Sequence, residues 1–236
     1  MAGTITTTPA TVSADAGTLR LQEELLLLAL DDEKGVVSRS AEDKLPKVLA
    51  RAILAELRLE GRVIFEGEGS RATVRPLSRE PLDQELMDAC LAVISQPGPA
   101  REVSHWLETL PVRCDLGRLA AEGLCSRGVL SEEKGRFLLV FSRPRYPERD
   151  PKAEVEVRRR LRDAVFTDLS EVDLRTSLLA GLAHDAGLLD LCFDPAAVRE
   201  RSKRLERLMA GEHLGRAASK GDEGAVFAEV VGALHR

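Results

Sequence analysis

The sequence has few of the residues that build metal centres and disulfide frameworks. Its four cysteines are Cys90, Cys114, Cys125 and Cys192, and no two of them have the C-x-x-C spacing typical of a zinc site. The four histidines lie apart from the cysteines and from one another. We therefore expect no metal, no cofactor and no disulfide, and reduced, mostly buried thiols of the kind found in the cytoplasm.

Long apolar runs and targeting signals are also missing. The longest apolar run, Leu25 to Leu30, has six residues, whereas a membrane-spanning helix needs roughly 20. Residues 1–18 carry no basic residue and no apolar core, so they do not resemble a signal peptide. We predict a disordered tail over 1–18, one folded domain over 19–236, and a cytoplasmic protein that contacts the inner face of the membrane only peripherally.

Sequence motifs of common enzymes are absent. There is no G-x-S-x-G, no Walker A motif, no H-E-x-x-H and no G-x-G-x-x-G. The stretch EGEGS at 66–70 predicts a hairpin turn, because the lysine and the helix of a phosphate-binding loop do not follow it. His184 and Asp185 are adjacent on a predicted helix and point about 100° apart, so they do not form a dyad. We expect no catalytic residues and no enzymatic activity.

The apolar residues that are present recur mainly with a helical period. This pattern predicts a mainly α protein, a single-domain helical bundle around a hydrophobic central helix at 174–192, with short β-hairpins of which one projects. The other predicted helices lie at 21–30, 45–60, 83–95, 102–110, 115–127, 154–169, 198–209 and 223–234. Predicted strands flank the EGEGS turn, and FLLVF at 137–141 is a further strand.

The distribution of charge is uneven. The net charge is -5 and the pI about 5.6, yet residues 134–149 hold five basic residues and a single glutamate. Only seven of the 34 basic residues are lysines, and arginine is the side chain best suited to phosphate recognition. The segment FLLVFSRPRYPERDP at 137–151 is therefore either a solvated hairpin or a surface that contacts lipid or a neighbouring subunit.

A helix followed by two short strands occurs twice, which is also the outline of a winged helix-turn-helix unit. DNA binding is thus one alternative. It is disfavoured because Glu56, Glu60, Asp115 and Glu122 lie among the arginines of the two candidate recognition helices. Nucleic acid is not an expected partner.

Four colinear motifs resemble the Golgi phosphoprotein 3 family. They are LQEELLLLALDDEKG, ILAELRLEGR, VSHWLETL and RGVLSEEKGRFLLVF, and RPRYPERDP is similar to the equivalent segment of bacterial members. The resemblance covers residues 19 to 236. It implies a helical domain with a projecting hairpin and a non-enzymatic adaptor, which in eukaryotic members recognises phosphatidylinositol 4-phosphate and the tails of client proteins.

The resemblance also indicates where lipid would bind. The family's pocket tryptophan falls near Arg39 or Ser40, its helix arginine falls beside Arg51, and its paired arginines fall one position from Arg113 and Arg118. The hairpin that contacts membranes or other copies of the chain corresponds to Phe137, Leu138, Leu139, Val140, Phe141, Arg143 and Arg145. The expected partners are an anionic phospholipid surface, client proteins and further copies of the chain. A soluble oligomeric interaction module without lipid binding is the remaining alternative.

Overall fold

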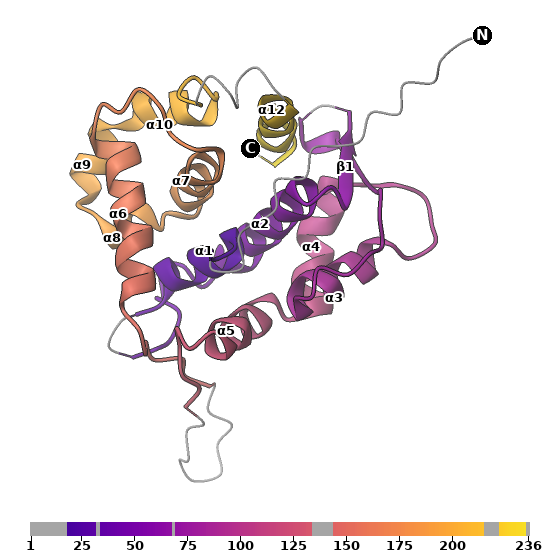
Figure 1. Ribbon diagram of the computed structural model, residues 1–236, viewed down its shortest axis with the longest axis horizontal. Coiled ribbons are helices and arrows are strands. Elements are labelled where there is room, and N and C mark those ends of the chain that lie inside the picture. Colours follow the sequence, from indigo (N-terminus) through magenta and orange to yellow (C-terminus); the bar gives the residue numbers. More distant parts are fainter. Residues whose placement is uncertain (1–17, 32–33, 68, 134–143, 215–221, 235–236) are drawn as a thin grey trace.

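A computed structural model of the chain describes residues 18–31, 34–67, 69–133, 144–214 and 222–234. The protein is mainly helical with a small antiparallel sheet, as predicted (Figure 1). The α-helices are α1 (Leu21–Ala29), α2 (Leu45–Leu59), α3 (Glu85–Ile94), α4 (Val103–Cys114), α5 (Leu116–Ser126), α6 (Lys152–Phe166), α7 (Leu174–Ala186), α8 (Leu189–Cys192), α9 (Pro195–Glu200), α10 (Ser202–Met209) and α12 (Asp222–Leu234). The predicted tail, apart from Thr18, lies outside the described residues.

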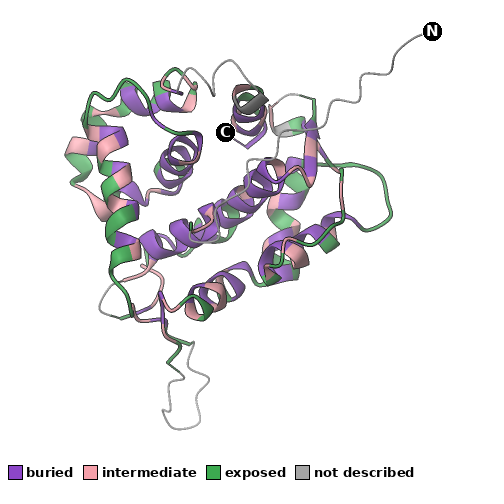
Figure 2. Cartoon of the chain, viewed as in Figure 1, coloured by how far each residue is buried: buried purple, intermediate pink, exposed green. Residues whose placement is uncertain are grey.

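Helices α1 and α2 occupy the middle of the molecule. Helices α6 to α10 group on one side of them and α3 to α5 on the other (Figure 1). All nine residues of α1 are buried, including Gln22, Glu23 and Glu24 (Figure 2). The prediction that 174–192 is the central helix was therefore wrong in detail. Helix α7 is largely buried, but His184 and Asp185 at its end are exposed. Helix α1 is the more enclosed of the two.

The helix boundaries differ from the prediction most clearly in three places. The segment 174–192 forms two helices, because Gly187 adopts a left-handed φ of 75° that ends α7. The segment 198–209 is divided at Arg201 between α9 and α10. In contrast, α4 continues past Pro111 to Cys114; the fixed φ of proline is compatible with a helix, although its ring removes one hydrogen bond.

The sheet pairs β1 (Val63–Glu66) with β2 (Thr73–Pro76), with Val63 opposite Pro76. These are the two strands predicted around EGEGS, and the turn itself contains a short 3-10 helix (Gly69–Arg71). A third strand, β3 (Arg101–Glu102), pairs with β2 and was not predicted. A strand of two residues is too short to show an alternating pattern in the sequence, so it is recognised only from its pairing with β2.

The arms of the predicted projecting hairpin are antiparallel at their base, where Glu133 pairs with Arg145. The tip, residues 134–143, lies outside the described residues. Gly35, in the connection between α1 and α2, accepts a 2.7 Å hydrogen bond from the Tyr146 amide. A Cβ atom at position 35 would lie 2.5 Å from the Pro147 nitrogen, so glycine permits this close approach. The hairpin base is thereby held against the α1–α2 connection.

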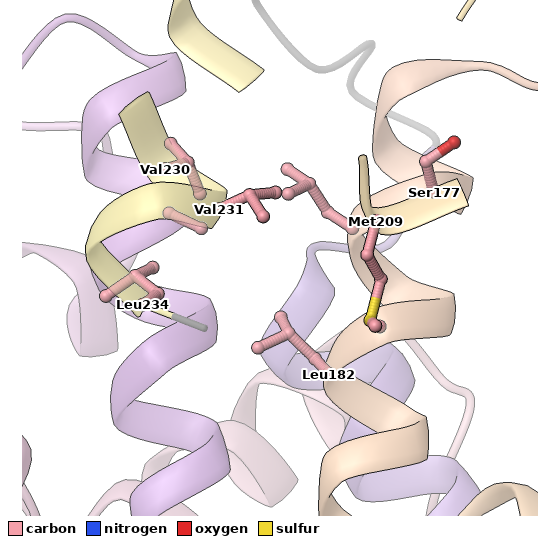
Figure 3. A pocket seen from close by; sticks show the side chains of 9 residues that line it. Ser177, Leu182, Met209, Val230, Val231 and Leu234 are labelled. Carbon is pink, nitrogen blue, oxygen red and sulfur yellow. The ribbon is translucent and has the colours of Figure 1, made fainter. Parts of the chain in front are cut away.

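A small cavity remains between α2, α7, α10 and α12 (Figure 3). Its volume is about 20 Å³, and its lining is almost entirely apolar, with Leu182, Met209 and Val230 among the contributing side chains. A buried water needs two to four polar partners, and Ser177 supplies the one polar side chain here. The cavity is therefore a packing gap in the core and too small for an organic ligand.

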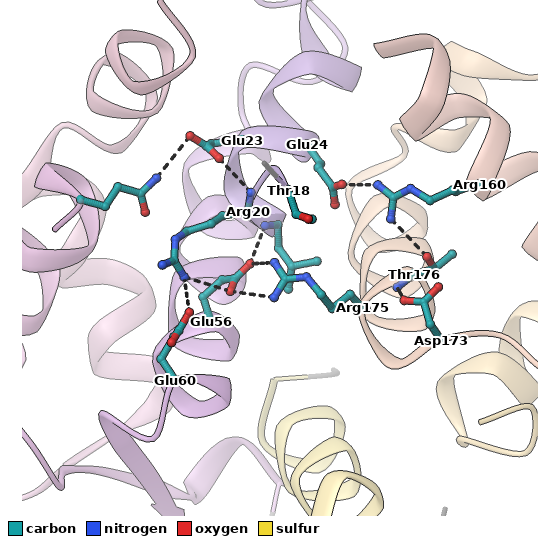
Figure 4. Close-up of polar contacts among 12 residues, drawn as sticks. Thr18, Arg20, Glu23, Glu24, Glu56, Glu60, Arg160, Asp173, Arg175 and Thr176 are labelled. Carbon is teal, nitrogen blue, oxygen red and sulfur yellow. Dashed lines mark hydrogen bonds and ion pairs between the residues drawn. The ribbon is translucent and has the colours of Figure 1, made fainter. Parts of the chain in front are cut away.

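Glu56 of α2 is fully buried at the centre of a network of charges (Figure 4). Its Oε1 accepts a 2.7 Å hydrogen bond from the backbone N–H of Leu21, the first residue of α1. Arg175 of α7 donates to both carboxylate oxygens, and Arg20 Nη1 lies 3.5 Å from Oε2. One carboxylate thus joins α1, α2 and α7.

Two further buried carboxylates on α1 extend this network. Glu24 pairs with Arg160 of α6, whose Nη1 also donates to Thr176 Oγ1 at 3.2 Å. Glu23 accepts a 3.2 Å hydrogen bond from Gln84 Nε2. Burial raises the pKa of Glu24 to about 7, although the adjacent Arg160 opposes this shift.

Replacing Glu56 with alanine is expected to lower the free energy of unfolding by about 3 to 5 kcal/mol. The reason is that Arg175 and the Leu21 amide would remain buried without their acceptor. Glu66→Ala is the matched control, since it removes an exposed partner of Arg75 and should cost at most about 1 kcal/mol. Urea unfolding of both variants measures the difference, and equal losses would contradict the central role of Glu56.

Stability should depend on pH through Glu24. Its pKa is raised from 4.5 to about 7 in the folded protein, so between these values the native state binds the proton more tightly. The free energy of unfolding should therefore fall as pH rises through this window, on the order of 3 kcal/mol for a shift of this size. Glu24→Gln should flatten this slope, whereas Glu85→Gln, on the exposed start of α3, should not. Identical slopes in urea melts of the two variants would exclude Glu24 as the source.

Candidate functional site

The hairpin is the first candidate surface, and most of it lies outside the described residues, namely Phe137, Leu138, Leu139, Val140, Phe141 and Arg143. Arg145 is described, and its side chain is exposed at the base of the arms. Its backbone pairs with Glu133 in both directions, with N···O distances of 2.8 and 3.1 Å. A guanidinium is therefore presented to solvent from a fixed backbone position next to the predicted contact segment.

Arg51 is positioned by α2 and engaged by α7. Its Nη1 lies 3.3 Å from Oδ2 of Asp185 at the exposed C-terminal end of α7, and the Arg51 side chain keeps 18% of its surface exposed. This contact turns the Asp185 carboxylate toward α2. Its neighbour His184 is exposed on the same helix end. Asp185 therefore serves as the ion-pair partner of Arg51.

Arg118 lies on the exposed face of α5 and is bound to its own helix. Its Nε donates to Asp115 at 2.9 Å and its Nη1 to Glu122 at 2.6 Å. Asp115 has a left-handed φ of 44° and separates α4 from α5. All three side chains are substantially exposed, and exposed pairs contribute only about 0 to 1 kcal/mol. A phosphate could therefore compete for Arg118 at little cost.

Arg39 and Ser40 are exposed in the connection between α1 and α2, the same connection that holds the hairpin base. Arg113 is exposed at the end of α4 and lines a cleft together with Arg75, Arg79 and Arg101. That lining contains none of the other predicted lipid-binding arginines. The structure thus distributes the predicted residues over the α1–α2 connection, the α2–α7 contact, the surface of α5 and this cleft.

The cleft arginines were not predicted as a group from the sequence. Arg75 and Arg79 follow one another around β2, but Arg101 and Arg113 come from β3 and α4. The four side chains come together only because β3 pairs with β2. Since β3 was not predicted, the sequence offered no sign that these segments meet.

The described residues contain neither a metal-binding cluster nor a membrane-spanning helix. No group of three or more His, Cys, Asp or Glu side chains there is arranged to hold a metal ion. Within the same residues, no helix combines the length and apolar character that crossing a bilayer requires.

Comparison with known proteins places the chain in a family. The model of Golgi phosphoprotein 3 (GPP34) matches residues 21–221, which is nearly all of the described fold. A vacuolar protein sorting-associated protein 74 from Eremothecium gossypii is 27% identical over 221 residues, a match that covers 80% of this chain. The chain spans 66% of the length of that relative. The resemblance noted in the sequence is therefore confirmed, and the chain belongs to the Golgi phosphoprotein 3 family.

Proposed function

We propose that this protein is a peripheral membrane adaptor that binds anionic lipid head groups and has no enzymatic activity. Membership of the Golgi phosphoprotein 3 family is the observation that carries the proposal. The relative named for vacuolar protein sorting is consistent with a role in membrane traffic. The expected setting is the cytoplasmic surface of a membrane, with client proteins and further copies of the chain as additional partners.

The charge pattern supports a contact made through the hairpin. Residues 134–149 carry a net charge of +4 in a protein whose total is -5. Basic residues close to an anionic bilayer each contribute about 1 kcal/mol, while apolar residues contribute in proportion to the area they bury. The sequence places the apolar run 137–141 next to Arg143 and Arg145, so both contributions are available to one segment.

The proposal also includes four further arginines, which the structure places at separate positions and whose partners differ. Arg39 and Arg113 are exposed and form no ion pair with another described residue. Arg118 is held by exposed carboxylates that a phosphate could replace. Arg51 is mostly buried against Asp185, so we propose that it orients the site more than it contacts the head group. In eukaryotic members the corresponding pocket takes phosphatidylinositol 4-phosphate, which is the first lipid to test.

Replacing Arg143 and Arg145 together with serine should weaken binding to anionic vesicles by about 2 kcal/mol, because two charges near the surface are lost. The loss should shrink as salt rises. Truncating Phe141 or Leu139 should instead reduce binding at every salt concentration, provided that this face of the strand points outward. Co-sedimentation with vesicles of phosphatidylcholine, with and without phosphatidylinositol 4-phosphate or phosphatidylserine, measures both effects.

The matched control removes the same charge elsewhere. Arg199 and Arg207 are exposed on α9 and α10, away from the hairpin in the sequence, so replacing both with serine should leave vesicle binding nearly unchanged. If the unaltered protein fails to sediment with every anionic vesicle, the lipid-binding proposal is wrong. If both double variants lose binding equally, net charge rather than the hairpin determines it.

A further inference from the structure

A cleft of about 520 Å³ lies between β2, the end of α3, β3 and α4. One side is formed by residues 95–100, which connect α3 to β3 and include Pro97 and Pro99. Proline fixes the backbone φ angle, so this side of the cleft is comparatively stiff. An adjoining cavity of about 450 Å³ shares Arg79, Ser95, Gln96 and Pro97 with the cleft, and its other lining residues are apolar except for Asp88. Sites for small organic ligands are commonly of this size.

The charge of the cleft is of one sign. Arg75, Arg79, Arg101 and Arg113 line it, and no aspartate or glutamate does. Arg75 is paired with Glu66 on β1, with Nη2 and Oε1 2.6 Å apart. The other three guanidiniums are exposed and form no ion pair with any residue that the structure describes. Three guanidinium groups without an ion-pair partner among the described residues are therefore available to a ligand in this cleft.

Two residues that line the cleft carry a buried hydrogen-bond donor without a partner among the described residues. Trp106 is only 7% exposed, and its indole Nε1 has no acceptor among the described residues. Ser95 is 8% exposed, and its hydroxyl likewise has no partner there. Buried indole N–H groups usually find an acceptor. The edge-on contact of Trp106 with the His105 ring, at 5.0 Å between centroids, does not supply one.

We propose that this cleft binds a phosphorylated small molecule or head group. The phosphate would contact Arg79, Arg101 and Arg113, since a dianion with three acceptor oxygens satisfies several guanidinium forks at once. Trp106 and Ser95 supply neutral donors, and the apolar part of the lining accommodates the organic portion of the ligand. The site does not rest on lipid binding by the hairpin, because its occupant can be a soluble phosphate ester as well as a lipid head group.

The test uses the full chain and inorganic pyrophosphate as the probe. Trp106 is the only tryptophan, so its emission reports on this cleft alone, and calorimetry provides an independent measure. We expect saturable binding. Replacing Arg79, Arg101 and Arg113 together with serine should weaken it at least about a hundredfold, given the strength of charge-assisted hydrogen bonds. All three residues are exposed, so circular dichroism should show an unchanged fold.

The matched control replaces Arg199, Lys203 and Arg207 with serine, which removes the same charge from the exposed surface of α9 and α10. This variant should bind pyrophosphate like the unaltered protein. Absence of saturable binding, or equal weakening in both triple variants, would overturn the proposal. So would tighter binding of a polyglutamate peptide than of pyrophosphate, because the cleft would then select carboxylates.

A second variant tests the neutral donor. Trp106→Phe retains an aromatic ring but removes the N–H, and it should weaken pyrophosphate binding several-fold by calorimetry, as expected for one hydrogen bond. An unchanged affinity would show that the ligand does not reach the indole and would overturn the assigned geometry.

The source of the phosphate is decided by competition. Displacement of pyrophosphate by phosphatidylcholine vesicles that contain a phosphatidylinositol phosphate identifies a lipid head group. Displacement only by the soluble inositol phosphate identifies a free ester, and failure of both to compete overturns the proposal. The Arg143 and Arg145 double variant should still bind pyrophosphate, so a failure of the hairpin proposal and a failure of this one produce different results.

Discussion

The buried charge of Glu56 constrains the arrangement of the three innermost helices. Its carboxylate binds the first amide of α1, lies within α2 and receives the Arg175 guanidinium of α7. Removing such charges from water costs several kcal/mol per ion, and their attraction repays this only when the geometry is good. Leucine packing alone tolerates sliding or rotation of a helix, whereas an amide and a guanidinium must meet one carboxylate at fixed positions. The network therefore fixes the relative orientation of α1, α2 and α7 in addition to its contribution to stability.

Local patterns predicted the elements of the fold better than they predicted its centre. Pro46 and Gly61 bracket α2 almost where the sequence indicated, and the β1–β2 hairpin formed around EGEGS. The charged residues of α1 were harder to interpret, because an isolated glutamate among leucines normally marks a solvated face. Glu24 is instead buried against Arg160, 136 residues away. Local periodicity cannot indicate a partner at that separation, so α1 could not be recognised from the sequence as the most enclosed helix.

The hairpin and the arginine cleft differ in how far the sequence alone reveals them. The hairpin could be proposed from the sequence as a contact site because its charge inversion and its apolar run are contiguous there. The cleft could not, since its arginines extend from position 75 to position 113 and converge through a two-residue strand. Individual arginines such as Arg51 and Arg118 were proposed from the sequence as phosphate donors, and this remains a prediction. Whether a donor is already occupied by Asp185 or Glu122 depends on helix packing, which the sequence does not express.

Some arginines of this protein are buried and hold the fold together, whereas others are exposed. The abundance of arginine alone therefore does not indicate anion binding. Arg204 is almost fully buried and donates to the carbonyls of Ala164 and Leu169, at 2.7 and 3.0 Å, where α6 ends and the chain turns. Its planar fork reaches two acceptors that a lysine ammonium would not align. Arg79 and Arg101 leave the same fork exposed. A net charge of -5 does not oppose anion binding there, because charges beyond about 8 Å are screened at physiological salt. The potential that a ligand meets inside the cleft is therefore set by its own guanidiniums and not by the acidic surface as a whole.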